Sequence, residues 1–286
     1  MNFKHSKNIH PSADAMSKIY AITWSNNLMR LAVALADRSI KLFDEHGEKK
    51  EQFSTKAGGT KSNKSYVVRD MAFSPDSTKL SIAQSDNIVF IYKLGTVWGD
   101  RKSICNKFAQ NSPVTCLVWP KDRPSELYFG LAEGKVKVGM LKSNTSQNLY
   151  STESFVVSIT ASPDSKFLLS GHLDGVIYKF NIENGNLQKM VIHPSVPYCL
   201  GWGNDILAGG NDYKVIFYND IGSKIQTFDY SNDDKIKEFT VCKVSPSGDC
   251  IAVGNYNRFF VYLFNNKKSQ WEEVIIYLNL GFFKIY

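Results

Sequence analysis

Hydrophobic and polar positions recur along this chain in blocks that each contain four short runs, three of them apolar. A block opens with an apolar quartet, such as AITW at residues 21–24, and the quartet is followed by a polar turn, such as SPDS at residues 74–77. Next come a run of small apolar residues, a turn with an acidic residue, a β-branched and aromatic run, and a more polar fourth run. Short runs of this kind predict strands, and no stretch has the longer period of a helix. Each block is therefore predicted to form four strands.

The blocks repeat with a nearly constant spacing. The last residues of the quartets are Trp24, Phe73, Trp119, Ala161, Trp202 and Val244. The intervals between them are 49, 46, 42, 41 and 42 residues, which are the periods of a four-stranded propeller blade. The sequence therefore predicts an all-β fold, a β-propeller over residues 1–274 with six recognisable blades. We expect about 24 strands and no helix longer than two turns.

An acidic residue keeps phase with the quartets and marks the turn between the second and third strand. These landmarks are Asp37, Asp86, Glu133, Asp174 and Asp212, with Asn257 at the sixth position. An aspartate in a tight turn commonly accepts backbone hydrogen bonds from that turn. We therefore interpret the four aspartates as structural turn acids, which are spread one per blade and cannot converge as a catalytic pair.

The tryptophans of the quartets, Trp24, Trp119 and Trp202, recur at the repeat period and are predicted to be buried core aromatics. Small residues in the second strand suit the crowded part of a blade, where neighbouring sheets approach closely. The polar fourth strand suits an outer edge that faces water.

The two ends of the chain bear on the number of blades. Residues 3–10 are similar to the fourth strands of the blocks, so they are predicted to be the closing strand of the last blade. The other three strands of that blade are missing, because only an apolar tail, residues 275–286, follows the sixth block. We favour a seven-bladed propeller truncated at its C-terminal side, with an aberrant tail or the start of an incomplete blade. A six-bladed propeller with an odd tail is the alternative.

The composition indicates the class of partner and the cellular compartment. The chain has a net charge of +7, but its lysines are scattered, so the balance favours an acidic protein partner over nucleic acid. Five cysteines without C-x-x-C spacing fit a reduced compartment. The N-terminus has no apolar run of signal-peptide length, and the tail is shorter than the roughly twenty residues that span a bilayer. We expect a soluble intracellular protein, with only weak membrane contact through the tail.

No motif of catalytic or ligand-binding chemistry is present in the sequence. The histidines show no paired metal-ligand spacing, and there is no nucleophile elbow or phosphate-binding glycine loop. The sequence therefore predicts no catalytic, cofactor-binding or metal-binding residues, and a protein that is not an enzyme.

Large or basic residues follow the turn acids and should share one face of the propeller. This face suits an acidic protein partner. Its candidate partner-binding residues are Arg38, Lys135, Tyr213, Lys214 and Arg258.

The segments between the landmarks carry a more specific resemblance. Residues 43–56 (FDEHGEKKEQFSTK) and 64–108, with LSGHLDG at 169–175 and QWEEV at 270–274, resemble the N-terminal WD-repeat propeller of the largest subunit of intraflagellar transport complex B. The resemblance runs from residue 1 to about 274 and includes loops, such as VWGD at 97–100, that the repeat does not require.

The resemblance implies a non-enzymatic scaffold of the intraflagellar transport machinery, which docks fellow subunits in cilium assembly and maintenance. It also implies a calponin-homology domain of a fellow subunit as a partner, and a location in the cilium, its basal body and the cytoplasm. The alternative is a vesicle-coat-like or membrane-peripheral propeller scaffold, because coat subunits share the propeller plan and this chain is basic.

Overall fold

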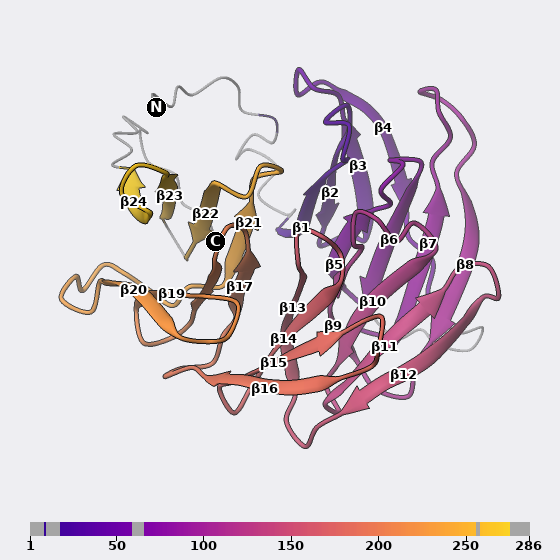
Figure 1. Cartoon of the computed structure of the whole chain (residues 1–286). Coiled ribbons are helices and arrows are strands. Elements are labelled where there is room, and N and C mark those ends of the chain that lie inside the picture. The colour runs from indigo at the N-terminus through magenta and orange to yellow at the C-terminus, as the bar shows by residue number, and fades with distance from the viewer. Residues whose placement is uncertain (1–8, 10–17, 59–65, 256–257, 275–286) are drawn as a thin grey trace. The chain divides into compact units, whose positions relative to one another are not determined.

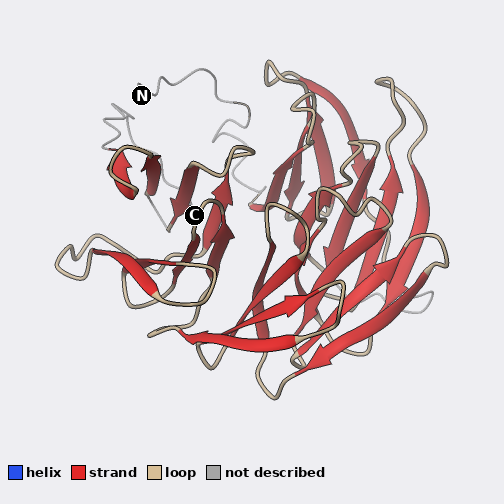
Figure 2. Ribbon diagram, viewed as in Figure 1, coloured by secondary structure: helices blue, strands red, loops and turns tan. Residues whose placement is uncertain are grey.

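The computed structural model describes residue 9 and residues 18–58, 66–255 and 258–274. The described residues fall into two compact units, which we call the N-terminal unit and the C-terminal unit and which divide between Val156 and Val157. Each unit contains three four-stranded antiparallel sheets (Figures 1 and 2), and no helix occurs in the described residues. The expected closing strand at 3–10, apart from Ile9, and the tail at 275–286 lie outside the described residues.

In the N-terminal unit, each sheet follows the chain order of its strands. The first sheet consists of β1 (Ile19–Trp24), β2 (Leu31–Leu35), β3 (Ser39–Phe43) and β4 (Lys49–Ser54). The second consists of β5 (Val68–Phe73), β6 (Lys79–Gln84), β7 (Ile88–Lys93) and β8 (Ser103–Ala109). The third consists of β9 (Val114–Val118), β10 (Glu126–Leu131), β11 (Lys135–Met140) and β12 (Thr145–Ser151).

The C-terminal unit repeats the same topology. Its first sheet consists of β13 (Val156–Ala161), β14 (Phe167–His172), β15 (Val176–Asn181) and β16 (Leu187–Ile192). The second consists of β17 (Cys199–Trp202), β18 (Ile206–Gly209), β19 (Lys214–Tyr218) and β20 (Lys224–Asp229). The third consists of β21 (Val241–Val244), β22 (Cys250–Gly254), β23 (Phe259–Asn265) and β24 (Gln270–Val274). The predicted all-β fold of four-stranded blades is confirmed, whereas the number of blades stays a prediction.

Burial follows the role of each strand within its sheet. The second strands are the most buried, and every residue of β2 is buried. The fourth strands alternate between exposed and half-buried residues, as in β4 and β20. First strands of successive sheets lie side by side within a unit, β1 beside β5 and β5 beside β9. This arrangement explains why the second run of each block consists of small apolar residues.

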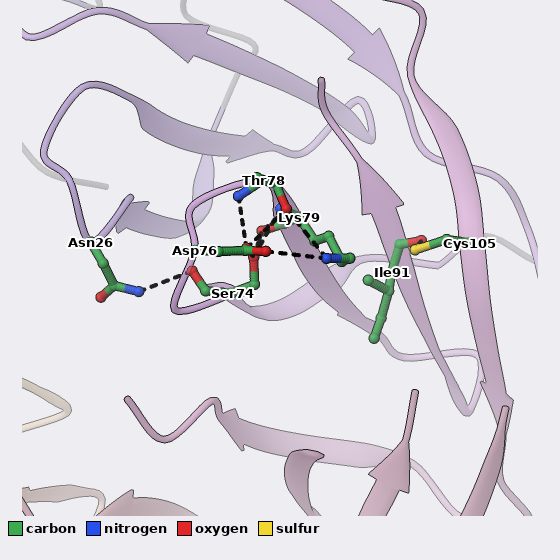
Figure 3. A network of polar contacts seen from close by, with 7 residues as sticks. All are labelled: Asn26, Ser74, Asp76, Thr78, Lys79, Ile91 and Cys105. Atoms are coloured by element: carbon green, nitrogen blue, oxygen red, sulfur yellow. Dashed lines mark hydrogen bonds and ion pairs between the residues drawn. The ribbon is translucent and has the colours of Figure 1, made fainter. Parts of the chain in front are cut away.

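The turn after the first strand has the same hydrogen bonds in several repeats, and Figure 3 shows it in the second sheet. The amide of Ser74 donates to the Lys79 carbonyl at 2.9 Å, and the Ser74 hydroxyl accepts from the Lys79 amide, also at 2.9 Å. Asp76 accepts from the amide and the hydroxyl of Thr78 at 3.1 and 2.9 Å. The preceding sheet contributes Asn26, whose amide nitrogen donates to the Ser74 carbonyl at 3.0 Å. These contacts tie the turns of neighbouring sheets together.

The prediction that all three quartet tryptophans are buried is right for Trp119, partly right for Trp202 and wrong for Trp24. Trp119 is 7% exposed and packs in a cluster that includes Val89 of the preceding sheet, and Trp202 is half-buried. Trp24, however, is 44% exposed. The equivalent Phe73 is buried because it packs against the first sheet, and the described residues of the N-terminal unit contain no sheet before the first one to cover Trp24.

Candidate partner-binding surface

The turns between the second and third strands share one end of their sheets, because antiparallel strands alternate in direction. We call this end of each sheet the acid-turn end. The residue after each turn acid has a positive φ: 69° at Arg38, 67° at Asn87, 83° at Gly134, 85° at Gly175 and 60° at Tyr213. Glycine and asparagine tolerate this conformation, whereas a larger side chain costs about 1 kcal/mol there. Arg38 and Tyr213 are therefore held in strained positions on the surface.

Two of the turn acids bond within their own turns. Asp37 accepts hydrogen bonds from the amide and the hydroxyl of Ser39 at 2.9 and 2.7 Å, and these bonds lower the pKa of Asp37. Asp174 accepts from the amide of Val176 at 3.1 Å. Both carboxylates fix the start of the third strand.

The other two turn acids reach the segment that follows the fourth strand of the preceding sheet. Asp86 accepts from the amide of Gly58 at 2.8 Å. Asp212 accepts from the hydroxyl of Ser195 at 2.8 Å. These bonds connect successive sheets, which the sequence pattern did not indicate.

The structure places Arg38 and Lys135 in the N-terminal unit, and Tyr213, Lys214 and Arg258 in the C-terminal unit. Three of the four cations form ion pairs: Lys135 with Glu133 at 3.1 Å, Lys214 with Asp229 at 3.2 Å, and Arg258 with Asp233 at 2.8 Å. Arg38 instead lies over the ring of Tyr66, 5.2 Å from its centroid.

Among these four cations, Arg38 is the one without a carboxylate partner in the described residues. Pairs at the surface contribute only about 0.2–1 kcal/mol, so the three paired cations remain free to exchange partners.

A depression of about 450 Å³ lies at the acid-turn end of the C-terminal unit. It is lined by Leu173, Asp174, Gly175, His193, Pro194, Ser195, Val196, Asn211 and Asp212. A backbone hydrogen bond joins two of its lining residues: the His193 amide donates to the Gly175 carbonyl at 2.8 Å. Gly210 is also required here, since a Cβ atom at this position would lie 2.0 Å from the Val196 carbonyl oxygen. The close approach at Gly210 brings the Ser195 hydroxyl to Asp212.

His193 is the buried titratable group of this depression. Its side chain is 2% exposed, and its Nδ1 atom lies 2.8 Å from the hydroxyl of Tyr218. Burial lowers the pKa of His193 to about 4 and raises the pKa of Tyr218 to about 12, so both groups are neutral at pH 7. His193 Nε2 and Asp212 Oδ2 are buried and have no hydrogen-bond partner within the described residues.

The sequence reasoning missed His193. A single histidine after a fourth strand has no spacing signal, and its environment arises only when Asp212 and Tyr218 of the next sheet pack beside it.

The described residues offer little other chemistry. They contain no group of three or more histidine, cysteine or acidic side chains that could hold a metal ion. All five cysteines are free thiols, and burial raises the pKa of Cys116 to about 12. Among the described residues, no helix has the length and apolar character needed to cross a membrane.

Comparisons with known proteins agree with the repeat architecture. Residues 144–181 match the family described as "WD domain, G-beta repeat". The solved structure of the computationally designed Ika8 protein superposes with a TM-score of 0.64 at 18% identity, over 87% of this chain and 71% of that chain. At this level of identity, the likeness concerns the fold alone.

Curated relatives are similar over nearly the whole chain. Intraflagellar transport protein 172 of Chlamydomonas reinhardtii is 50% identical over 96% of this chain, and its human homologue is 46% identical over 96%. Intraflagellar transport protein osm-1 of Caenorhabditis elegans is 38% identical over 96%. In each case the chain spans 16% of the length of the relative. The resemblance noted in the sequence is confirmed: this chain is homologous to the N-terminal WD-repeat region of intraflagellar transport protein 172.

Proposed function

We propose that this chain is a protein-interaction scaffold of the intraflagellar transport machinery, which binds fellow subunits during cilium assembly and maintenance. The observation that carries the proposal is 50% identity over 96% of the chain to intraflagellar transport protein 172 of Chlamydomonas reinhardtii. The repeated four-stranded sheets support it, because repeat proteins of this kind present rigid turns for binding. We place the chain in the cilium, at the basal body and in the cytoplasm.

The proposal assigns no reaction to the protein. The relatives are named for transport, and the WD repeat is a binding architecture, so both favour a non-catalytic scaffold. The relatives do not favour the vesicle-coat-like or membrane-peripheral alternative.

We propose the acid-turn ends of the sheets as docking surfaces, and a calponin-homology domain of a fellow subunit as one partner. Support comes from Arg38 and Tyr213, two large exposed side chains at the positive-φ position that follows a turn acid. Further support comes from Arg38, whose guanidinium has no carboxylate partner among the residues that the structure describes. An acidic patch on the partner would pair with this guanidinium and compete for the other cations.

The test is the association rate with the purified calponin-homology subunit across a salt series. Reversal of three cations at the acid-turn end (Arg38→Glu, Lys135→Glu, Arg258→Glu) should slow association about tenfold or more at low salt. The matched control reverses three exposed cations at the opposite end of the N-terminal sheets: Lys93→Glu, Arg101→Glu and Lys142→Glu. The control should lose much less. Equal losses in both proteins would indicate net charge alone, and a larger loss in the control would move the docking surface to the opposite end.

A further inference from the structure

We propose that the depression lined by His193, Ser195 and Asp212 binds the guanidinium group of an arginine side chain from a partner protein. This inference rests on the proposed scaffold function only in taking the occupant to be a protein. The proposed ligand at the acid-turn end of the C-terminal unit is basic. The partner expected from the sequence is acidic.

The first support is a pair of buried acceptors without donors. Asp212 uses its Oδ1 atom for the Ser195 hydroxyl at 2.8 Å, while its Oδ2 atom is buried and has no partner within the described residues. A buried carboxylate oxygen left without a hydrogen bond is costly, so the site favours a ligand that donates one.

His193 supplies the second acceptor. When Nδ1 carries the proton and donates it to the Tyr218 hydroxyl oxygen, 2.8 Å away, Nε2 is left with a lone pair. His193 is 2% exposed, and Nε2 has no partner within the described part of the chain. Because the ring is neutral at pH 7, it does not repel a cation.

The charge of the lining also fits a cation. Two of the nine lining residues are aspartates, and none is lysine or arginine, although the chain as a whole carries a charge of +7. Lys214, two residues after Asp212 in the sequence, is paired with Asp229 at 3.2 Å. The depression is therefore a locally acidic site on a basic protein.

The presence of two acceptors favours arginine over lysine. A guanidinium is a planar fork that can donate to two acceptors at once, and it stacks well on aromatic rings. Tyr213 follows Asp212 directly, is 38% exposed and is held at a φ of 60°. Leu173, 45% exposed in the lining, offers apolar surface to the methylene stem of an arginine.

The probe is N-acetyl-Gly-Arg-Gly-amide, titrated into the full chain while backbone amide chemical shifts are recorded. The matched peptides carry citrulline, the neutral isostere, or lysine. We expect saturable shifts at Gly175, Val196 and Tyr213 with the arginine peptide, binding at least about tenfold weaker with citrulline, and intermediate binding with lysine.

Two variants separate binding from folding. Asp212→Asn keeps an oxygen that can accept from Ser195 and removes the charge, so it should weaken the arginine peptide about tenfold. The matched control is Asp86→Asn, the equivalent turn acid of the second sheet, which should leave the affinity unchanged. Tyr213→Gly removes the aromatic ring and should weaken binding, and because it also relieves the positive φ it should not lower the thermal midpoint.

Equal affinity for the arginine and citrulline peptides would overturn the proposal, as would an unchanged affinity in Asp212→Asn. No shift with any peptide up to tens of millimolar would overturn it as well and would assign the two acceptors to an ordered water molecule. None of these outcomes affects the proposed transport function, which is measured with a fellow subunit.

Discussion

Two turns of this protein each contain an aspartate that accepts a hydrogen bond from a serine, but they differ in whether the remaining polar atoms have partners. The turn at Ser74–Lys79 satisfies its polar groups internally: the Ser74 hydroxyl accepts from the Lys79 amide, and Asp76 accepts from Thr78. At the turn that contains Asp212, the aspartate accepts from Ser195 of the preceding segment, and within the described residues Asp212 Oδ2 and the neighbouring His193 Nε2 have no hydrogen-bond partner.

The Ser74 turn has a structural role in the fold, whereas the Asp212 turn is a candidate binding site. The Ser74 turn recurs with the same bonds at Ser162 and Ser245, so the fold requires it. The arrangement around Asp212 depends on His193 and Ser195, which line the same depression. Buried polar atoms that lack partners within the described residues are atoms that a bound ligand can satisfy.

The largest expected contrast between the two turns is in their response to acid. Burial lowers the pKa of His193 to about 4 from an ordinary value of 6.5, so the unfolded state binds more protons than the folded state between these values. Stability is therefore full above pH 6.5 and falls as the pH drops towards 4, by up to about 3 kcal/mol. Urea unfolding across this range should show the loss in the wild type and not in His193→Gln.

The Ser74 turn should be insensitive over the same range. Partial burial opposes ionisation of Asp76, but hydrogen bonds from Ser74 and Thr78 outweigh it and lower the pKa of Asp76 to about 2. Stability from Asp76 is thus lost only as the pH falls below 3.8 towards 2, and it amounts to less than about 1 kcal/mol because the carboxylate is largely exposed. Amide hydrogen exchange measures the two regions separately, at Lys79 for the Ser74 turn and at Val176 for the C-terminal unit. An equal loss of protection at both amides between pH 6.5 and 4 would contradict this contrast. His46→Gln, at an exposed histidine, is the control.

The next contrast is in serine deletion. Ser74→Ala removes a buried hydroxyl that accepts from Lys79 and donates to Asp76, so we expect a loss of about 1–2 kcal/mol in the free energy of unfolding. Ser195→Ala removes one bond at the edge of a depression and should cost about 0.5 kcal/mol. Chemical denaturation of the two variants measures both values, and a larger loss in Ser195→Ala would reverse our assignment of roles.

Removal of the carboxylate charge should destabilise the protein at Asp76 but not at Asp212. Asp76→Asn should cost about 0.5 kcal/mol, because Asn27 accepts the equivalent amide bond in the first sheet at 3.2 Å. Asp212→Asn removes a charge whose second oxygen is buried and has no partner among the described residues, so stability should stay equal or rise by about 0.5 kcal/mol. A thermal midpoint that falls in Asp212→Asn by more than in Asp76→Asn would show that this carboxylate is structural.

The smallest contrast concerns glycine substitution at positive φ. Tyr213→Gly relieves strain at φ 60° and should raise the free energy of unfolding by about 0.5 kcal/mol. Ser77 has a φ of 59°, but its hydroxyl also accepts from the Asn27 amide at 3.1 Å, so Ser77→Gly should lose about 0.5 kcal/mol. Denaturant titrations on both variants test the signs, and a loss in Tyr213→Gly would mean that the tyrosine ring packs favourably on its own fold.

The sequence was sufficient for the local structure and insufficient for contacts between sheets. Alternating and small apolar runs predicted the strands because those signals lie within one strand, and the position of Trp119 in the repeat predicted its burial. Trp24 occupies the same position in the repeat, but its exposure depends on the sheet that precedes it, which the repeat pattern does not specify. The bonds of Asp86 and Asp212 to the preceding segments were missed for the same reason.

The most direct test of the account is hydrogen exchange of the chain with and without a purified fellow subunit of the transport complex. The account predicts protection on binding at the acid-turn end, in residues 36–39 and 132–135 of the N-terminal unit and in residues 173–176 and 210–214 of the C-terminal unit. Turns at the opposite end, at residues 25–30, 74–79 and 141–145, should exchange at unchanged rates. Protection confined to those opposite turns would contradict the claim that partners dock at the acid-turn end.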